Sequence, residues 1–162
     1  MRSEHLDLVA FTHDSGVDLL MAPAMRGAGA PWGADAVEAL LHCATCRGAV
    51  VIDGGRCLGG AIDAACDRAD HIVIVAPAQR RAVPRVRALV ARYAERSPRL
   101  VISHALSDDL SVAAMAKAAG RAGRWSLPRS ERDARDLCAG RWPAGRRRGL
   151  GVRMAAIAQE LR

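Results

Sequence analysis

Short apolar runs alternate along the chain with longer amphipathic stretches. The runs predict strands over residues 17–22, 50–53, 72–76, 100–103 and 124–127. The amphipathic stretches predict helices over residues 34–46, 61–68, 83–95, 110–119, 130–139 and 151–162. The strands are continuous rather than alternating apolar runs, which is typical of burial on both faces. The order of elements therefore predicts an α/β fold, a three-layer αβα arrangement in which right-handed βαβ units build a mainly parallel sheet.

Prolines support these boundaries. Pro23, Pro77 and Pro128 follow predicted strands, and Pro84 falls in the first turn of a predicted helix, where proline is tolerated. Residues 1–15 are predicted to be irregular, apart from a short helix or strand near residues 6–11. With 162 residues, no internal repeat and no low-complexity linker, the chain is predicted to form one domain over residues 1–162.

The composition predicts a soluble, cytoplasmic protein. Hydrophobic residues make up 51% of the chain and charged residues 25%. No segment approaches the roughly 18 apolar residues of a membrane span, and the N-terminus lacks the apolar stretch of a signal peptide. The five cysteines form no disulfide framework, which favours a reducing compartment. Cys43 and Cys46 have the spacing of a zinc or redox pair, but without a second close pair we expect buried, apolar cysteines.

The positive charge is concentrated in the last quarter of the chain. Of the 24 basic residues only Lys117 is a lysine, and the formal net charge is +7. Residues 121–162 hold eleven arginines against four acidic residues, which accounts for the whole imbalance. This Arg-rich region of the same domain predicts either a solvated face or an electrostatic contact with nucleic acid, an acidic membrane surface or an acidic partner. Arg146, Arg147 and Arg148 are the candidates for such a contact.

Two segments follow predicted strands with residues suited to a ligand site. Asp53, Gly54 and Gly55 end the strand over residues 50–53, and Pro77 and Gln79 follow the next strand. Ligands of open α/β sheets bind at the carboxyl ends of the strands, where an acid followed by glycines lets backbone approach a phosphate or a metal ion. These residues therefore predict the remnant of a nucleotide and magnesium site. The alternative is that Asp53 caps a tight turn.

Other kinds of ligand site have less support in the sequence. Gly27, Gly29 and Gly33 follow a strand and open a helix, which faintly copies a dinucleotide-binding loop, but the third glycine is displaced and Pro31 intrudes. An enzyme with a Rossmann-like fold is accordingly a possible function. It ranks below a nucleic-acid-binding protein that uses the Arg-rich region. No nucleophile elbow or paired histidine spacing is present, and neither a catalytic residue nor a metal ligand set is predicted.

The order and spacing of the segments resemble the later part of MinD/ParA-type P-loop ATPases, particularly the CpaE/TadZ-like and septum-site-determining branch. The resemblance covers residues 16–162. SGVDLLMAP resembles the family's strand that ends in a small residue and proline, and DAVEALLHCATCRGAVVIDGG resembles its helix and Walker B or switch strand. HIVIVAPAQ and its flanking helices resemble the following strand and helices, and GRWSLPRSERDARDLCAGRWP resembles a late segment of the family. The resemblance implies a P-loop NTPase-like fold and a role in septum or cell-pole positioning, or in secretion or pilus assembly.

Two departures from the family pattern change the expected activity. Residues 1–15 contain neither glycine nor lysine, so the phosphate loop and its lysine are missing, and the fold is expected to be incomplete at the N-terminus. Ser103 and His104 stand near the place of the family's base-contacting asparagine. We therefore expect a pseudo-ATPase rather than an enzyme, with a truncated member of an active ATPase family as an alternative. No cofactor is expected unless a phosphate loop comes from upstream or from a partner. The missing strand would leave a sheet edge unpaired, which predicts a protein partner or self-association. The resemblance also implies a possible location at the membrane or cell pole.

Overall fold

In the computed structural model of the chain, a parallel sheet organises the second half. The structure describes residues 6–8, 10–13, 16–20, 33–55, 59–120, 125–141 and 150–161. The chain divides into two compact units, an N-terminal unit (Met1–Ala69) and a C-terminal unit (Asp70–Arg162), and each is described by itself. The prediction of one domain over residues 1–162 stays a prediction.

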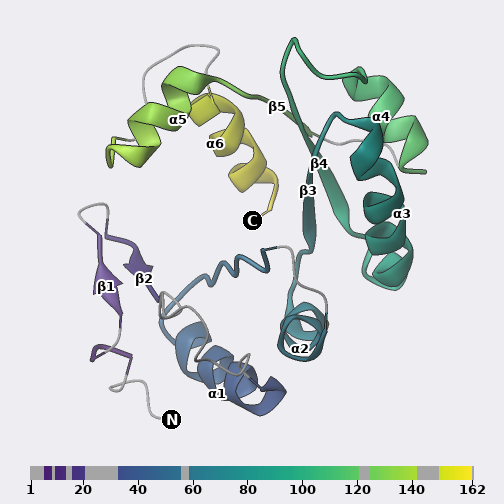
Figure 1. Ribbon diagram of the computed structural model, residues 1–162. Coiled ribbons are helices and arrows are strands. Elements are labelled where there is room, and N and C mark those ends of the chain that lie inside the picture. The colour runs from purple at the N-terminus through teal and green to yellow at the C-terminus, as the bar shows by residue number, and fades with distance from the viewer. Residues whose placement is uncertain are drawn as a thin grey trace, which may run out of the picture. The chain divides into compact units, whose positions relative to one another are not determined.

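The sheet of the C-terminal unit has three parallel strands in the order β3-β4-β5 (Figure 1). They are β3 (Val73–Pro77), β4 (Arg99–His104) and β5 (Trp125–Pro128). The register pairs Ile74 with Leu100 and Val101 with Trp125. The strands predicted over residues 72–76, 100–103 and 124–127 are therefore confirmed to within one or two residues at each end.

Helices follow each strand, as the alternating pattern predicts. After β3 come η2 (Arg80–Ala82), α3 (Val83–Arg92) and η3 (Ala94–Arg96); α4 (Val112–Ala118) follows β4; α5 (Glu131–Cys138) and α6 (Leu150–Glu160) follow β5. Figure 1 shows α3 and α4 on one side of the sheet and α6 on the other, so the unit has three layers. No helix in the described ranges of the chain is long and apolar enough to cross a membrane.

The core of this unit lies between the sheet and the pair α3–α4. Ile74, Leu100 and Ile102 point from the strands towards Val86 of α3 and Met115 of α4. Ile102 and Met115 are both 0% exposed. Because paired residues of parallel strands share a face, Val73, Val75, Arg99, Val101 and Trp125 lie on the opposite face.

On that opposite face, α6 packs along β5. The indole N–H of Trp125 donates to a carboxylate oxygen of Glu160 at 3.0 Å, and Arg99 donates to the backbone oxygen of Glu160 at 3.0 Å. The Arg99 guanidinium also lies 5.7 Å from the centre of the Trp125 ring, within reach of a cation–π interaction. These polar contacts attach the last helix to the sheet, and none of its described residues over Leu150–Glu160 is buried.

The outer edge of β3 has a defined hydrogen-bonding pattern. The oxygen of Ile72 accepts from Arg99 N at 2.8 Å, and Ala78 N donates to Ser103 O at 2.9 Å. Even-numbered residues of β3 therefore direct their peptide groups to β4, and Val73, Val75 and Pro77 direct theirs away from it. Within the described residues β3 pairs only with β4, and Val75 is 63% exposed.

The N-terminal unit has a smaller set of buried side chains. A two-stranded antiparallel sheet of β1 (Phe11–Thr12) and β2 (Asp18–Leu19) precedes α1 (Ala34–Thr45) and α2 (Gly60–Arg68), which pack together. Leu6, Leu41, Cys43 and Ala65 are its buried residues among those described. The helices predicted over residues 34–46 and 61–68 are confirmed. Cys43 is buried as expected, whereas Cys46 is exposed at the end of α1.

The strand predicted over residues 50–53 is wrong, and the one predicted over residues 17–22 is confirmed only at Asp18–Leu19, with residues 21–22 outside the described residues. Residues 50–53 form no strand, and Val51 is 95% exposed. The strand predicted over residues 17–22 is reduced in the described residues to β2, whose side chains are exposed. An apolar run becomes a strand only if a neighbour pairs with its peptide groups, and the described residues provide residues 50–53 with no such neighbour.

Candidate functional site

The carboxyl edge of the three-stranded sheet gathers a polar cluster, as expected for a ligand-binding edge of an α/β fold. The strands β3, β4 and β5 end together at Pro77, His104 and Pro128. Backbone bonds continue past these ends, from Leu110 N to Ala78 O at 3.2 Å and from Arg129 N to His104 O at 2.6 Å. The loops that follow the three strands are therefore held close to one another.

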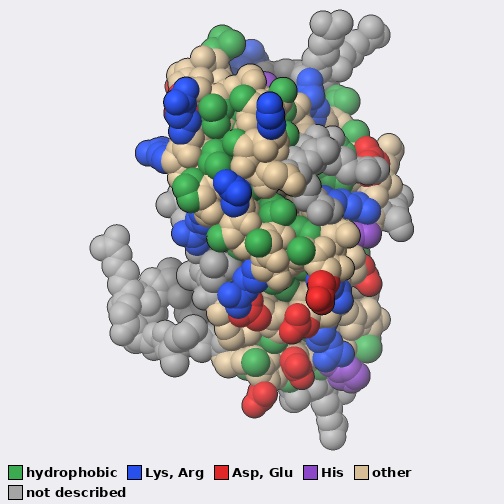
Figure 2. Space-filling model, turned by 90° about the vertical axis from the view of Figure 1, so that its right-hand side faces the viewer, with side chains coloured by type: hydrophobic (Ala, Val, Ile, Leu, Met, Phe, Trp, Pro, Cys, Tyr) green, Lys and Arg blue, Asp and Glu red, His purple; other side chains and the backbone are tan. Residues whose placement is uncertain are grey.

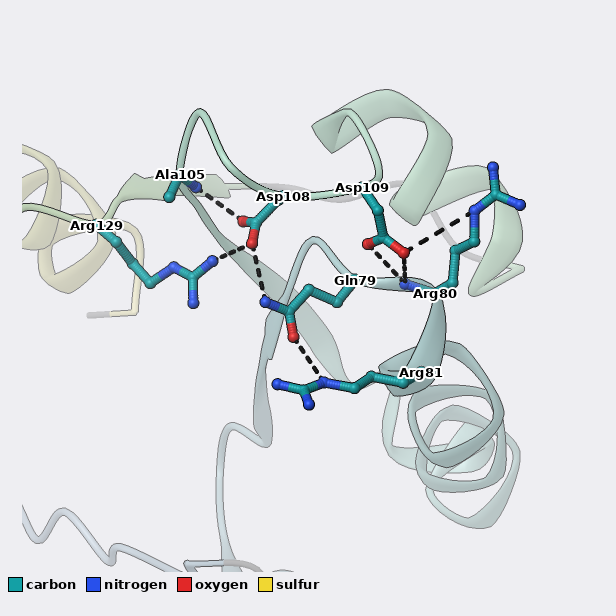
Figure 3. Close-up of polar contacts among 7 residues, drawn as sticks. All are labelled: Gln79, Arg80, Arg81, Ala105, Asp108, Asp109 and Arg129. Atoms are coloured by element: carbon teal, nitrogen blue, oxygen red, sulfur yellow. Dashed lines mark hydrogen bonds and ion pairs between the residues drawn. The ribbon is translucent and has the colours of Figure 1, made fainter.

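Asp108 joins the three loops (Figure 3). One carboxylate oxygen accepts from the side-chain amide N–H of Gln79 at 3.0 Å and from the guanidinium of Arg129; the other accepts from Ala105 N at 2.8 Å. The side chain of Asp108 is 1% exposed. The hydrogen bond from Arg129 lowers the pKa of Asp108 below its ordinary value, against the opposing effect of burial. Asp108 is thus a buried carboxylate kept ionised by its donors.

Gln79 lies at this edge, as predicted, but both the nitrogen and the oxygen of its side-chain amide have partners. Its amide N–H donates to Asp108, and its amide oxygen accepts from Nε of Arg81 at 2.9 Å. Pro77 ends β3 one residue before the buried Ala78. A ligand that used Gln79 would have to compete with Asp108 and Arg81 for the same amide.

Asp109 occupies the start of the helical segment that follows β3. Both of its carboxylate oxygens accept from Arg80 N, at 3.1 and 3.3 Å, and the Arg80 side chain lies 4.0 Å away in an exposed ion pair (Figure 3). A helix N-terminus favours negative charge because its first N–H groups lack intrahelical partners. Asp109 therefore fills a position that an anionic ligand group could otherwise take.

Asp53, Gly54 and Gly55 belong to the N-terminal unit, where Asp53 closes a turn. Its carboxylate accepts from Gly55 N at 2.8 Å. Gly55 has a positive φ of 59°, which a side chain would oppose, and a Cβ at Gly54 would come within 3.4 Å of Ile62 Cγ2. This local geometry matches the turn-capping alternative. The proximity of Asp53 to Pro77 and Gln79 stays a prediction, because these residues belong to different units.

The remaining candidates do not form a described site. Arg146, Arg147 and Arg148, and most of the glycine-rich loop ending at Gly33, lie outside the described residues. Among the residues that are described, no three His, Cys, Asp or Glu side chains come together as a metal site would require.

Sequence reasoning missed the members of the edge cluster other than Gln79. Asp108 follows β4 by four residues, and Arg129 directly follows β5. Scoring charged residues in the loop after every predicted parallel strand, rather than only after strands resembling a known motif, would have found them. Their mutual pairing depends on the strand order, which sequence alone does not give.

Comparison with known proteins identifies the fold. No protein-family model matches the chain, and no curated protein matches it by sequence. The crystal structure of a ParA family ATPase from Chlorobium tepidum TLS superposes with a TM-score of 0.84 over 100% of this chain and 71% of that chain, at 18% identity. The chain therefore has a ParA-like, P-loop NTPase-type α/β fold, and the predicted fold class is confirmed.

Proposed function

We propose that the chain is a degenerate MinD/ParA-like protein that binds other proteins rather than hydrolysing nucleotide. Its role is regulatory or scaffolding, in septum or cell-pole positioning or in secretion or pilus assembly, through a partner protein or self-association. The ParA-like fold supports the general class. The cellular process rests on the sequence resemblance to the CpaE/TadZ-like branch.

The observation that carries the proposal is the self-contained polar cluster at the carboxyl edge of the sheet. Asp108 takes up the donors of Gln79, Arg129 and Ala105. Asp109 takes up the N–H group that opens the helical segment after β3. A cluster that satisfies its own donors and acceptors stabilises the loops without a ligand. This favours an edge kept for structure over one kept for nucleotide.

The position of the only lysine supports the same view. A phosphate loop needs a lysine whose ammonium neutralises phosphate charge. Lys117 lies in the last turn of α4. This helix begins beyond the carboxyl end of β4 and runs back along the sheet. It is therefore carried away from the carboxyl edge. A phosphate loop supplied by another segment or by a partner would be needed for ATP and magnesium to bind.

Calorimetric titration with ATP and magnesium tests the proposal. We expect no binding tighter than ~10 µM, equivalent to about −7 kcal/mol, and no release of phosphate. Asp53→Ala should then show the same lack of nucleotide binding and phosphate release as the unmodified chain, like the matched control Asp35→Ala on the exposed first turn of α1. Turnover that disappears in Asp53→Ala and persists in Asp35→Ala would instead establish an active ATPase.

A further inference from the structure

A shallow groove of about 480 Å³ lies between α3 and α4 of the C-terminal unit. Its lining consists of Arg87 from α3 and Ala114, Lys117, Ala118 and Gly120 from α4 and its end. Ala114, which is exposed, and Ala118, which is half-buried, form the apolar part of the lining, here called the floor, and one cation stands on each helix. Among the lining residues that the structure describes there is no aromatic ring and no acid.

The two cations of the groove are available to a partner. Arg87 and Lys117 are exposed, and neither forms an ion pair within the part of the chain that the structure describes. The segment leading along this side of the unit is also strongly basic, since residues 80–96 contain six arginines and one acid, Glu95. Figure 2 shows several Lys and Arg side chains among hydrophobic ones in the upper part of the view, and Asp and Glu side chains in the lower part. The surface therefore complements a negatively charged molecule.

We propose that this groove docks an acidic amphipathic helix of a partner protein. Small side chains on α4 let another helix approach closely, and its glutamates or aspartates would pair with Arg87 on one side and Lys117 on the other. An apolar floor adds hydrophobic contact, which a phosphodiester backbone cannot use. The described lining also offers no aromatic ring on which single-stranded bases could stack. Charge complementarity and the alanine floor together favour an acidic helix over nucleic acid.

The inference gives the scaffolding role proposed above a class of partner, and it rests on that role for its biological meaning. It does not depend on nucleotide chemistry. A chain that hydrolyses ATP but binds the acidic helix would refute the proposed function alone. A chain that neither binds ATP nor the helix would refute this inference alone.

Fluorescence anisotropy with three labelled probes tests the inference on the whole chain. The first probe is a Glu/Ala/Leu peptide of about 20 residues, long enough to form a helix in water. The second has lysine in place of glutamate, and the third is a DNA duplex of about 20 base pairs. We expect the acidic peptide to bind, the basic peptide not to bind, and the affinity to fall as salt rises from about 50 to 300 mM.

Two pairs of variants separate a shaped site from general charge. Arg87→Glu with Lys117→Glu should weaken peptide binding at least roughly tenfold, whereas Arg132→Glu with Arg135→Glu, an equal charge change on α5, should not. Ala114→Gln fills the floor without changing charge and should also weaken binding about tenfold. Its control is Ala113→Gln, an exposed position on α4 outside the lining. Circular dichroism confirms that each variant is folded.

Three outcomes would overturn the inference. The acidic peptide does not bind to the unmodified chain. Both charge-reversal pairs weaken binding equally, which would show non-specific attraction. The duplex binds more tightly than the peptide and Ala114→Gln leaves peptide binding unchanged, which would assign this surface to nucleic acid.

Discussion

Ile102 in the C-terminal unit and Ile52 in the N-terminal unit stand in apolar runs of similar length, VIS and VID in their sequence context. Ile102 is 0% exposed within β4, between β3 and β5, whereas Ile52 is 45% exposed and belongs to no strand. The difference lies in the neighbours, because β4 has a paired strand on each side and helices over its core face. A hydrophobic run defines a strand only together with the elements that satisfy its backbone and cover its side chains.

The helices of the two units differ in the same sense. Ser111 opens α4 and Ser130 opens α5, and their hydroxyl oxygens accept from Ala114 N at 3.1 Å and Asp133 N at 3.2 Å. In contrast, α1 and α2 follow Gly33 and Gly59 and have no side-chain cap. The starts of α4 and α5 are therefore fixed by side-chain caps that α1 and α2 lack, although α3 of the C-terminal unit has no such cap either.

Net charge separates the two units as well. Residues 1–69 contain five basic and nine acidic residues, and residues 70–162 contain nineteen basic and eight acidic ones. Counted along the sequence, the whole excess of positive charge falls in residues 121–162. The reason is that the negative charge of the first unit and the positive charge of segment 80–96 cancel within residues 1–120. Electrostatic arguments for this chain must accordingly be made for each unit rather than for the total.

The largest expected effect comes from truncating the two isoleucines. Ile102→Ala should lower the free energy of unfolding by about 2–5 kcal/mol, because it leaves a cavity in a packed core. Ile52→Ala, the matched change in the N-terminal unit, should cost about 1 kcal/mol or less. Urea unfolding followed by circular dichroism measures both. Equal losses would show that the two apolar runs are equally buried in solution and would remove the contrast.

Acid should act on the C-terminal unit through Asp108. Since Arg129 lowers the pKa of folded Asp108, the unfolded state binds more protons in acid than the folded state does. The stability contributed by Asp108 is thus complete above its ordinary pKa of about 4 and is lost as pH falls through the lowered folded pKa. In urea unfolding from about pH 5 to pH 2, the unmodified chain should lose more stability than Asp108→Asn, which starts lower at pH 7. Parallel curves for the two proteins would contradict this role of Asp108.

The smallest effects concern helix capping. Ser111→Ala should lower the free energy of unfolding by about 1 kcal/mol, because Ala114 N loses its acceptor. Gly33→Ser at the start of α1, where the backbone is already extended at φ −66° and ψ 158°, should raise it by roughly a few tenths of a kcal/mol. Thermal melts distinguish the two signs. A loss on Gly33→Ser would mean that the glycine is required there for another reason.

The sequence predicted the C-terminal unit almost completely. Its three strands, their helices and the parallel arrangement all follow from apolar runs between amphipathic stretches, with Pro84 and Pro128 near the boundaries. The positions of Pro77 and Gln79 at the carboxyl edge follow from the same reasoning. What remained hidden was how side chains pair across that edge, since Asp108, Gln79 and Arg129 come from three separate loops.

The N-terminal unit was predicted less well because its strands were judged from hydrophobicity alone. Residues 17–22 and 50–53 are mostly apolar, but their own sequence does not indicate which strand would pair with them. Asp53 illustrates the same difficulty for the site. An acid before two glycines fits either a metal ligand or a turn cap, and only the bond from Gly55 N shows the second use directly.

The proline that ends β3 restricts which strands can pair with the outer edge of the sheet. Pro77 lies in the row of residues whose peptide groups face away from β4, after Val73 and Val75, and it has no N–H to give. A strand from another molecule that paired with this edge could accept hydrogen bonds from the N–H groups of Val73 and Val75, but not from Pro77. Such a short register is a poor template for the repeated backbone pairing that builds fibrils. Pro77 therefore limits the backbone pairing that a second chain could make along the edge of β3 as described, independently of any part it plays near a ligand.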